Sequence, residues 1–296
     1  MTTFLELLAN GISVGAVYAL IALGFVVIFK ATEVVNFTHA SLLLAGGFLV
    51  AKLHPALGFW LALAAGVAGA ALVGALIEFL IIRRARVGSH GVLAIVTIGV
   101  DILLTTELTR QIGTDVLALG DPWRDQVLHL GPITIAETRV VALGVAAALI
   151  TAFLLAFKFT GWGVAMRATA EDAETAALMG VRLGRVSLSA WAVAGALAAI
   201  AALFLCVFPT PGLDRSTTAA AMKAFPAAIL GGLDSTTGAL AGGLIVGVTE
   251  ALMSGYQSQL AFLGRGIGDA APFLVMIAIL LFRPAGIFGT KELARV

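Results

Sequence analysis

Charged residues and cysteine are scarce in this chain of 296 residues. Only 12% of the residues are charged, whereas soluble domains average about 25%. The mean hydropathy is +1.05, and several apolar runs reach the roughly twenty residues that a helix needs to cross a bilayer. Cys206 is the only cysteine, which excludes an intrachain disulfide and a cysteine-rich metal site. The composition therefore excludes an ordinary water-soluble domain and predicts a polytopic membrane protein.

Motifs of catalysis and nucleotide binding are also lacking. The chain has no G-x-x-x-x-G-K-[ST] phosphate-binding loop and no H-E-x-x-H zinc motif. Its four histidines are scattered, and no serine or cysteine has a base at a recognisable spacing. The net charge is +1, and no basic patch interleaved with aromatic residues indicates a nucleic acid partner. We therefore expect a protein that is not an enzyme and that holds no cofactor or metal of its own.

Long apolar stretches follow one another along the whole chain. Because lipid offers the backbone no hydrogen bonds, stretches of this length are expected to be helices. We predict one all-α domain over residues 1–296, a bundle of eight or nine transmembrane spans that includes a short or re-entrant helix. The predicted spans are 10–29, 39–52, 58–82, 92–109, 139–158, 187–208, the short 220–231, 236–253 and 270–283.

The basic residues indicate the orientation of these spans, because short cytoplasmic loops are enriched in Lys and Arg. If the short helix counts as a crossing, eleven of the 18 basic residues fall on one face, which we predict to be cytoplasmic together with the C-terminus. Segment 111–138 then lies outside the cytoplasm. The eleven residues are Lys30, Arg83, Arg84, Arg86, Lys158, Arg167, Arg182, Arg185, Arg283, Lys291 and Arg295.

The loop 160–186 is the one long interior segment that is rich in charges of both signs. Thr169 and Asp172 have the spacing of a capping box, acidic residues including Glu171 follow in the first turn, and Gly180 suits a left-handed C-terminal cap. We predict a helix of about ten residues over 170–179, roughly 15 Å long. Its apolar face either docks on a soluble partner or lies on the lipid headgroups. This face carries Ala173, Ala176, Ala177, Leu178 and Met179.

Polar residues occur inside two predicted spans. Those at the start of the second span either cap and stabilise a helix end or line a cavity. Asp101 lies in the middle of the fourth span, and an ionisable group at that depth is a functional candidate. It is interpreted either as a buried, hydroxyl-bonded structural acid or as part of a transport pathway. The residues at the second span are Asn36, Thr38, His39 and Ser41.

A faint internal repeat is visible in two spans. Gly66 and Glu78 have the same separation as Gly238 and Glu250, and duplicated halves are common among transporters. Both glutamates are expected to pair with basic residues nearby. Two matched positions are weak evidence, so no functional prediction depends on the repeat.

Four stretches occur in an order typical of one transporter family. The segment 167–186, RATAEDAETAALMGVRLGRV, resembles the cytoplasmic coupling-loop motif of permease subunits in ATP-binding-cassette importers, specifically the high-affinity branched-chain amino-acid (LivH-type) permeases. The stretch 34–48, VVNFTHASLLLAGGF, is similar to the family's N-F-A-H-G-[DE]-L segment. The stretch 230–250 resembles its glycine-rich motif, and 283–289, RPAGIFG, matches its C-terminal signature.

This resemblance covers essentially the whole chain and implies a set of partners. These are two cytoplasmic ATPase subunits, a second related permease and an extracytoplasmic solute-binding protein, with ATP and Mg bound by the ATPases. The resemblance implies a multi-pass protein of the cytoplasmic (inner) membrane of a prokaryote. The ATPases would dock on the 170–179 helix. The substrate would be a branched-chain or other hydrophobic amino acid, or a small neutral amide such as urea.

The sequence departs from the family pattern at several positions, which leaves the substrate open. Where the family commonly has Gly and then Asp or Glu after the histidine, this chain has Ala40 and Ser41, and Asp234 stands where glycine is common. A second hypothesis is an ion-coupled secondary transporter that uses Asp101 as a proton carrier. An intramembrane enzyme is a third, which the absence of catalytic motifs disfavours.

Overall fold

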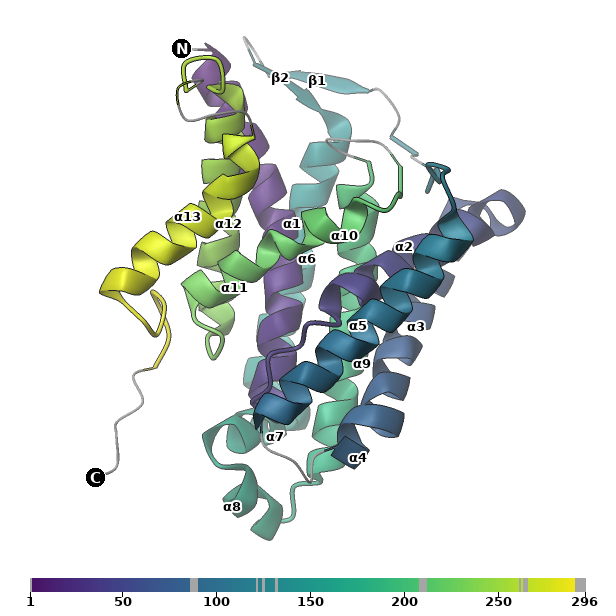
Figure 1. Cartoon of the computed structure of the whole chain (residues 1–296), viewed down its shortest axis with the longest axis vertical. Coiled ribbons are helices and arrows are strands. Elements are labelled where there is room, and N and C mark those ends of the chain that lie inside the picture. Colours follow the sequence, from purple (N-terminus) through teal and green to yellow (C-terminus); the bar gives the residue numbers. More distant parts are fainter. Residues whose placement is uncertain are drawn as a thin grey trace.

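The computed structural model describes residues 2–85, 90–120, 122–123, 126–130, 133–207, 212–260, 262 and 266–290. Within them, seven helices are long and apolar enough to cross a membrane, and the shorter apolar α13 (Ile267–Phe282) accompanies them. Together they form one helical bundle (Figure 1). The predicted all-α polytopic architecture is confirmed.

Each predicted span corresponds to one or two of the helices described. The seventh is divided, because α10 and α11 are separated at Lys223. The other helices, in chain order, are α1 (Thr2–Thr32), α2 (His39–Leu57), α3 (Phe59–Ile77) with the π-helical turn η1 (Glu78–Ile82) and α4 (Arg83–Ala85), α5 (His90–Ile112), α6 (Glu137–Phe159), α7 (Gly161–Glu171), α8 (Ala173–Leu178), α9 (Leu183–Leu205), α10 (Thr217–Met222), α11 (Ala224–Gly231) and α12 (Thr236–Gly255).

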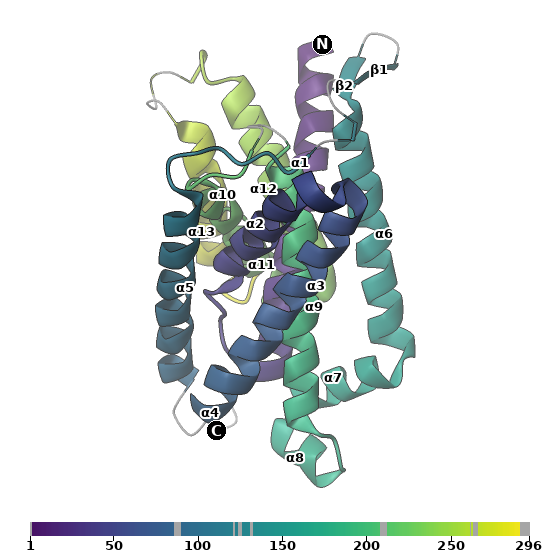
Figure 2. The same ribbon diagram turned by 90° about the vertical axis from the view of Figure 1, so that its right-hand side faces the viewer.

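A small β-hairpin lies in the segment predicted to be extracytoplasmic. Strand β1 (Val127–Leu130) pairs antiparallel with β2 (Ile133–Ala136) directly before α6. The hairpin lies at the end of the bundle opposite α8 (Figure 2). It was not predicted, since four-residue strands give only a weak pattern in sequence.

Helices α1 and α9 form the centre of the bundle. In the most apolar 18-residue stretch of each helix, 83% of the residues of α1 and 67% of those of α9 are buried, against 22% for α5 and for α6. A transmembrane helix buried on all sides belongs to a protein core, whereas a helix with one buried face belongs to the outer rim of the bundle. Packing therefore places α5 and α6 at the rim.

The long helices run through the bundle in both directions. Helix α3 packs on α9, and α12 packs on α1; α2 packs on α3, and α11 packs on α12. In Figure 1, α1, α3 and α13 descend, whereas α9, α12 and α5 ascend. The two matched stretches lie in α3 with η1 and in α12.

Glycines allow α12 to approach α1 closely. A Cβ atom on Gly247 would lie 2.3 Å from both the Cα and the backbone N of Gly15, and one on Gly243 would lie 2.5 Å from the backbone N of Ala19. Because the atoms met are backbone atoms, a side chain cannot be accommodated by changing a rotamer. Small residues thus set the distance between these helices, as expected for helix packing in lipid.

We predict that Gly247→Ala separates α1 from α12 and lowers the free energy of unfolding by about 1–3 kcal/mol, as overpacking does. Gly144→Ala in α6 is the matched control, because nothing lies within 4 Å of its Cβ position. Thermal unfolding of the purified protein in detergent would measure both. Equal midpoints for the two variants would contradict the close packing of α1 against α12.

Candidate functional site

Two short helices project from one end of the bundle (Figure 2). Helix α7 turns away from α6 at Thr160, whose hydroxyl accepts a hydrogen bond from the backbone N–H of Gly163. Helix α8 follows after the break at Asp172 and leads into α9. The projection occupies the loop 160–186, where one coupling helix was predicted.

The predicted helix boundaries in this loop are wrong. Thr169 does not cap a helix: it is buried inside α7, and its hydroxyl donates to the carbonyl of Ala165. Glu171 ends α7 rather than beginning a helix. The N-terminal cap is Asp172, whose Oδ1 accepts the N–H of Thr175 at 2.9 Å. An aspartate side chain that bonds a nearby N–H offers the backbone an alternative to a continuous helix, which divides the segment in two.

The end of α8 carries the exposed apolar side chains. Leu178 is 84% exposed and Met179 is 82% exposed, whereas Ala176 is buried. Ala177 is exposed beside them. Gly180 ends the helix with φ 91°, which confirms the predicted left-handed cap. Two large apolar side chains at the tip of a polar projection indicate a contact surface for another molecule.

Helix α2 begins inside the bundle. The chain leaves α1 at Thr32 and runs through 33–38 without helical structure before α2 starts at His39. Asn36 Oδ1 accepts the N–H of Thr38 at 2.9 Å, and the Ser41 hydroxyl donates to the Thr38 carbonyl at 2.9 Å. Both bonds are buried, so side chains here replace the water that an interrupted backbone would otherwise need.

Helix α5 is bonded to this interrupted segment. Thr97 Oγ1 accepts the N–H of Phe37 at 3.2 Å, and the Thr38 hydroxyl donates to the Thr97 carbonyl at 2.9 Å. One turn along α5, Asp101 Oδ1 accepts the N–H of Ser41 at 3.3 Å. The structure thus brings Thr38, Ser41 and Asp101 together, and half-buried Asp101 bonds a backbone N–H at the start of α2 rather than a hydroxyl.

His39 belongs to a different environment. Its ring is fully buried and packs on Phe25, with 4.6 Å between the ring centroids. A Cβ atom on Gly24 would lie 2.3 Å from the imidazole Cε1, so the glycine leaves room for the ring. His39 therefore anchors the start of α2 against α1, on the side of the bundle core.

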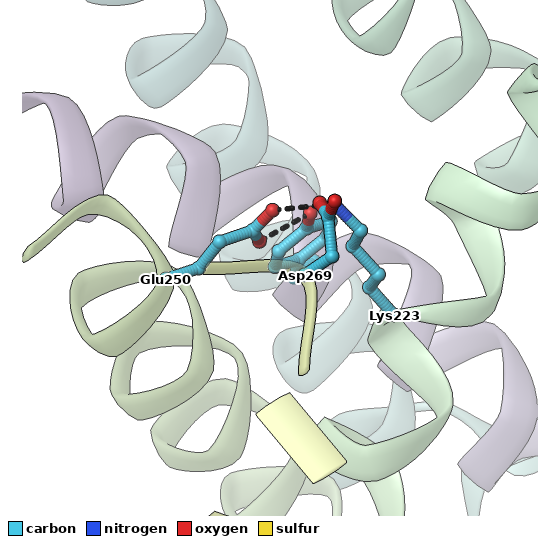
Figure 3. A network of polar contacts seen from close by, with 4 residues as sticks. Lys223, Glu250 and Asp269 are labelled. Atoms are coloured by element: carbon cyan, nitrogen blue, oxygen red, sulfur yellow. Dashed lines mark hydrogen bonds and ion pairs between the residues drawn. The ribbon is translucent and has the colours of Figure 1, made fainter. Parts of the chain in front are cut away.

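A partly buried ion-pair network connects the broken helix to the rest of the bundle (Figure 3). Lys223, between α10 and α11, lies 2.7 Å from Glu250 Oε1 of α12 and 2.6 Å from Asp269 Oδ1 of α13. The hydroxyl of Tyr18 in α1 donates to Glu250 Oε2 at 2.6 Å. The network thereby joins four segments of the chain: α1, α10–α11, α12 and α13.

Sequence reasoning singled out only Glu250 of this network. The expectation that Glu78 pairs with a neighbouring basic residue is confirmed by Arg83 at 3.3 Å. Glu250 also pairs, but with Lys223, 27 residues away. The available signal was a lysine inside the otherwise apolar stretch 217–231, since such a charge needs a partner.

The membrane-length helices, the interrupted helices within the bundle and the projecting helix pair are features of a membrane transport subunit. The chain belongs to the family described as branched-chain amino acid transport system / permease component, whose model matches residues 7–282.

Several known proteins are similar to this chain. The permease protein LivH of the high-affinity branched-chain amino acid transport system of Escherichia coli strain K12 is 32% identical, over 99% of this chain and 98% of its own length. Its counterpart BraD of Pseudomonas aeruginosa is 29% identical over the same shares. Among solved structures, PsaBC from Streptococcus pneumoniae in complex with Fab has a TM-score of 0.43 and 16% identity, over 95% of this chain and 89% of that one.

Family membership defines the class of the protein. The chain is a multi-pass membrane permease subunit of an ATP-binding-cassette importer, and it is not an enzyme. A permease of this class works with an ATPase and a solute-binding protein. The comparisons do not support the ion-coupled alternative.

Proposed function

We propose that this permease forms part of the translocation pathway for branched-chain or related hydrophobic amino acids. Two cytoplasmic ATPase subunits, which bind the ATP and Mg, drive it, and a second related permease completes the pathway. The observation that carries the proposal is the tip of α8, where Leu178 and Met179 are exposed at the end of a polar projection. The similar proteins named above are branched-chain amino acid permeases, which supports the choice of substrate.

The proposed orientation places α8 in the cytoplasm. Basic residues of the loops cluster at this end, including Arg83 and Arg84 of α4, as the positive-inside rule favours. Arg167 of α7 and Thr290 line the same cleft, so the last described residues lie at this end as well. We infer a cytoplasmic C-terminus and an external β-hairpin, which faces the solute-binding protein.

We place the pathway beside the two interrupted segments of the bundle, residues 33–38 before α2 and Lys223 between α10 and α11. Phe37, in the segment before α2, contacts Phe225, at the start of α11, with 5.5 Å between the ring centroids. Transporters commonly bind their substrates where helices are discontinuous. In this proposal Asn36, Thr38, His39, Ser41 and Asp101 stabilise one wall, and the aromatic rings give it an apolar surface. Selectivity then resides in the solute-binding protein.

Reconstitution tests the proposal against ion coupling. We predict that proteoliposomes of this chain alone take up no leucine under a pH gradient, and that uptake requires ATP, both ATPases, the second permease and the binding protein. Asp101→Asn should retain most of this uptake, because an amide oxygen still accepts the Ser41 N–H. Asp101→Leu leaves that buried N–H unsatisfied, which destabilises by about 1–3 kcal/mol.

The two variants separate the hypotheses. A proton carrier loses all uptake in Asp101→Asn, since an amide does not titrate. Gradient-driven uptake by the chain alone, abolished by this one substitution, would overturn the proposed function. Thermal unfolding of both variants shows whether any loss of uptake follows from a loss of stability.

A further inference from the structure

A charged cleft opens at the end of the bundle that carries α7. It has a volume of about 650 Å³, within the range of small-molecule sites. Its walls come from four regions of the chain: the end of α1, the corner between α6 and α7, the turn between α11 and α12, and Thr290. The lining residues are Phe29, Lys30, Glu33, Phe157, Arg167, Ala170, Glu171, Asp234 and Thr290.

Charges of both signs face this cleft, which we call the α1–α7 cleft. Lys30 is half-buried and lies over the ring of Phe157, 5.6 Å from its centroid. Among the described residues it forms no ion pair within 4 Å with Asp234 or Glu171, which line the same cleft. Lys30 lies at the end of α1, Glu171 at the end of α7 and Asp234 in the turn between α11 and α12.

The positions of the other charged groups are fixed by the fold. Arg167 donates to the carbonyls of Phe157 and Lys158 and thereby holds the corner between α6 and α7. Asp234 accepts hydrogen bonds from the backbone N–H and the hydroxyl of Thr290. These contacts leave Lys30 and Glu171 as the groups that are available to bind a ligand.

We propose that the α1–α7 cleft binds a free amino acid from the cytoplasm and that this occupancy slows import; the inference rests on the proposed function. The ammonium of Lys30 suits the carboxylate of the ligand, and the carboxylate of Glu171 suits its ammonium. The rings of Phe29 and Phe157 provide an apolar surface for a branched side chain. A phosphate or nucleotide fits poorly, because three carboxylates line the cleft against two cations.

A ligand in the α1–α7 cleft can regulate import because the walls of the cleft belong to different parts of the permease. Helix α7 leads to the proposed ATPase contact, whereas the α11–α12 turn belongs to the segment with the interrupted helix. The wall formed by the α11–α12 turn is bonded to segment 283–290, because the backbone N–H groups of Ile287 and Phe288 donate to the carbonyls of Leu230 and Gly231. A ligand that bridges both walls stabilises one relative arrangement, and it shifts the equilibrium by its difference in affinity between arrangements. Import needs both arrangements, so a bound ligand slows the cycle.

Equilibrium binding of radiolabelled leucine to the purified permease–ATPase complex, without the binding protein, tests the site. Lys30→Gln is expected to weaken binding roughly tenfold or more, as removal of a charged hydrogen bond does. Lys52→Gln is the matched control: Lys52 also lies 5.6 Å from a phenylalanine ring, that of Phe48, but does not line the cleft. Leucine trapped inside proteoliposomes should lower the initial uptake rate of wild type and Lys52→Gln relative to empty vesicles, but not that of Lys30→Gln.

Each other outcome overturns the inference. Equal inhibition in Lys30→Gln and wild type would place the effect elsewhere. Inhibition by trapped 3-methylbutylamine as strong as that by leucine would show that the carboxylate is not recognised. Binding by the permease alone but not by the complex would assign the cleft to the ATPase contact. Normal ATP-driven uptake without leucine binding would reject only this site, whereas absence of ATP-driven uptake would reject the proposed function itself.

Discussion

Replacing Leu178 and Met179 together by aspartate is expected to release the ATPase subunits and abolish ATP-driven import. Each side chain is more than four-fifths exposed in the isolated chain, and burial of a leucine or methionine side chain contributes about 1.5–3 kcal/mol. Loss of both corresponds to a fall in affinity of roughly two to four orders of magnitude. Co-purification of the ATPases and leucine uptake by the reconstituted complex would measure the effect.

We expect the double substitution to leave the fold and its stability unchanged. Both side chains already face solvent, and the cap of α8 depends on Asp172 and Gly180, which remain. Arg185→Ala, at an exposed position early in α9, is the control and should keep its ATPases. If the double aspartate variant retained normal uptake, the tip of α8 could not be where the ATPases dock.

The transmembrane architecture was predictable because lipid imposes a simple requirement. A span must be an apolar helix of about twenty residues, so hydropathy located the helices before any contact was known. The broken helix was visible in the sequence as a short stretch, residues 220–231. Helix ends were less predictable, as α2 shows by continuing to Leu57 past the predicted end at residue 52.

The coupling loop shows where local reasoning fails. The capping-box spacing of Thr169 and Asp172 satisfies the sequence rule, yet the structure uses Asp172 as the cap and places Thr169 inside the preceding helix. Both residues can cap a helix, and the choice depends on the length of helix that packs before the break. The C-terminal end was predicted correctly, because a glycine with positive φ has few alternatives.

Long-range polar contacts were beyond sequence reasoning. The partners in the Lys223 network are separated by 27, 46 and 232 residues, and nothing in local periodicity links them. The same holds for the contact of Asp101 with Ser41, 60 residues apart. Sequence can show that a charge in an apolar span needs a partner, whereas only packing determines which partner it finds.

Substituting Lys223 by methionine is expected to destabilise the protein by about 3–5 kcal/mol, the loss typical when one partner of a buried ion pair is removed. Methionine keeps the length of the side chain, so the change removes mainly the charge. Glu250, whose side chain is 15% exposed, then loses its cationic partner, and the contact between α10–α11 and α12 weakens. Thermal unfolding in detergent and ATP-driven uptake would measure stability and function.

Two further variants separate the buried part of the network from its exposed part. Asp269 is 74% exposed, so Asp269→Asn should lower stability by less than about 1 kcal/mol, as for other surface pairs. Adding Glu250→Gln to Lys223→Met removes the uncompensated charge while an amide oxygen still accepts the Tyr18 hydroxyl, so the double variant should recover much of the lost stability. If Lys223→Met and Asp269→Asn each lowered the free energy of unfolding by less than about 1 kcal/mol, solvent would be screening the whole network. The lysine could then not be what holds the interrupted helix against α12.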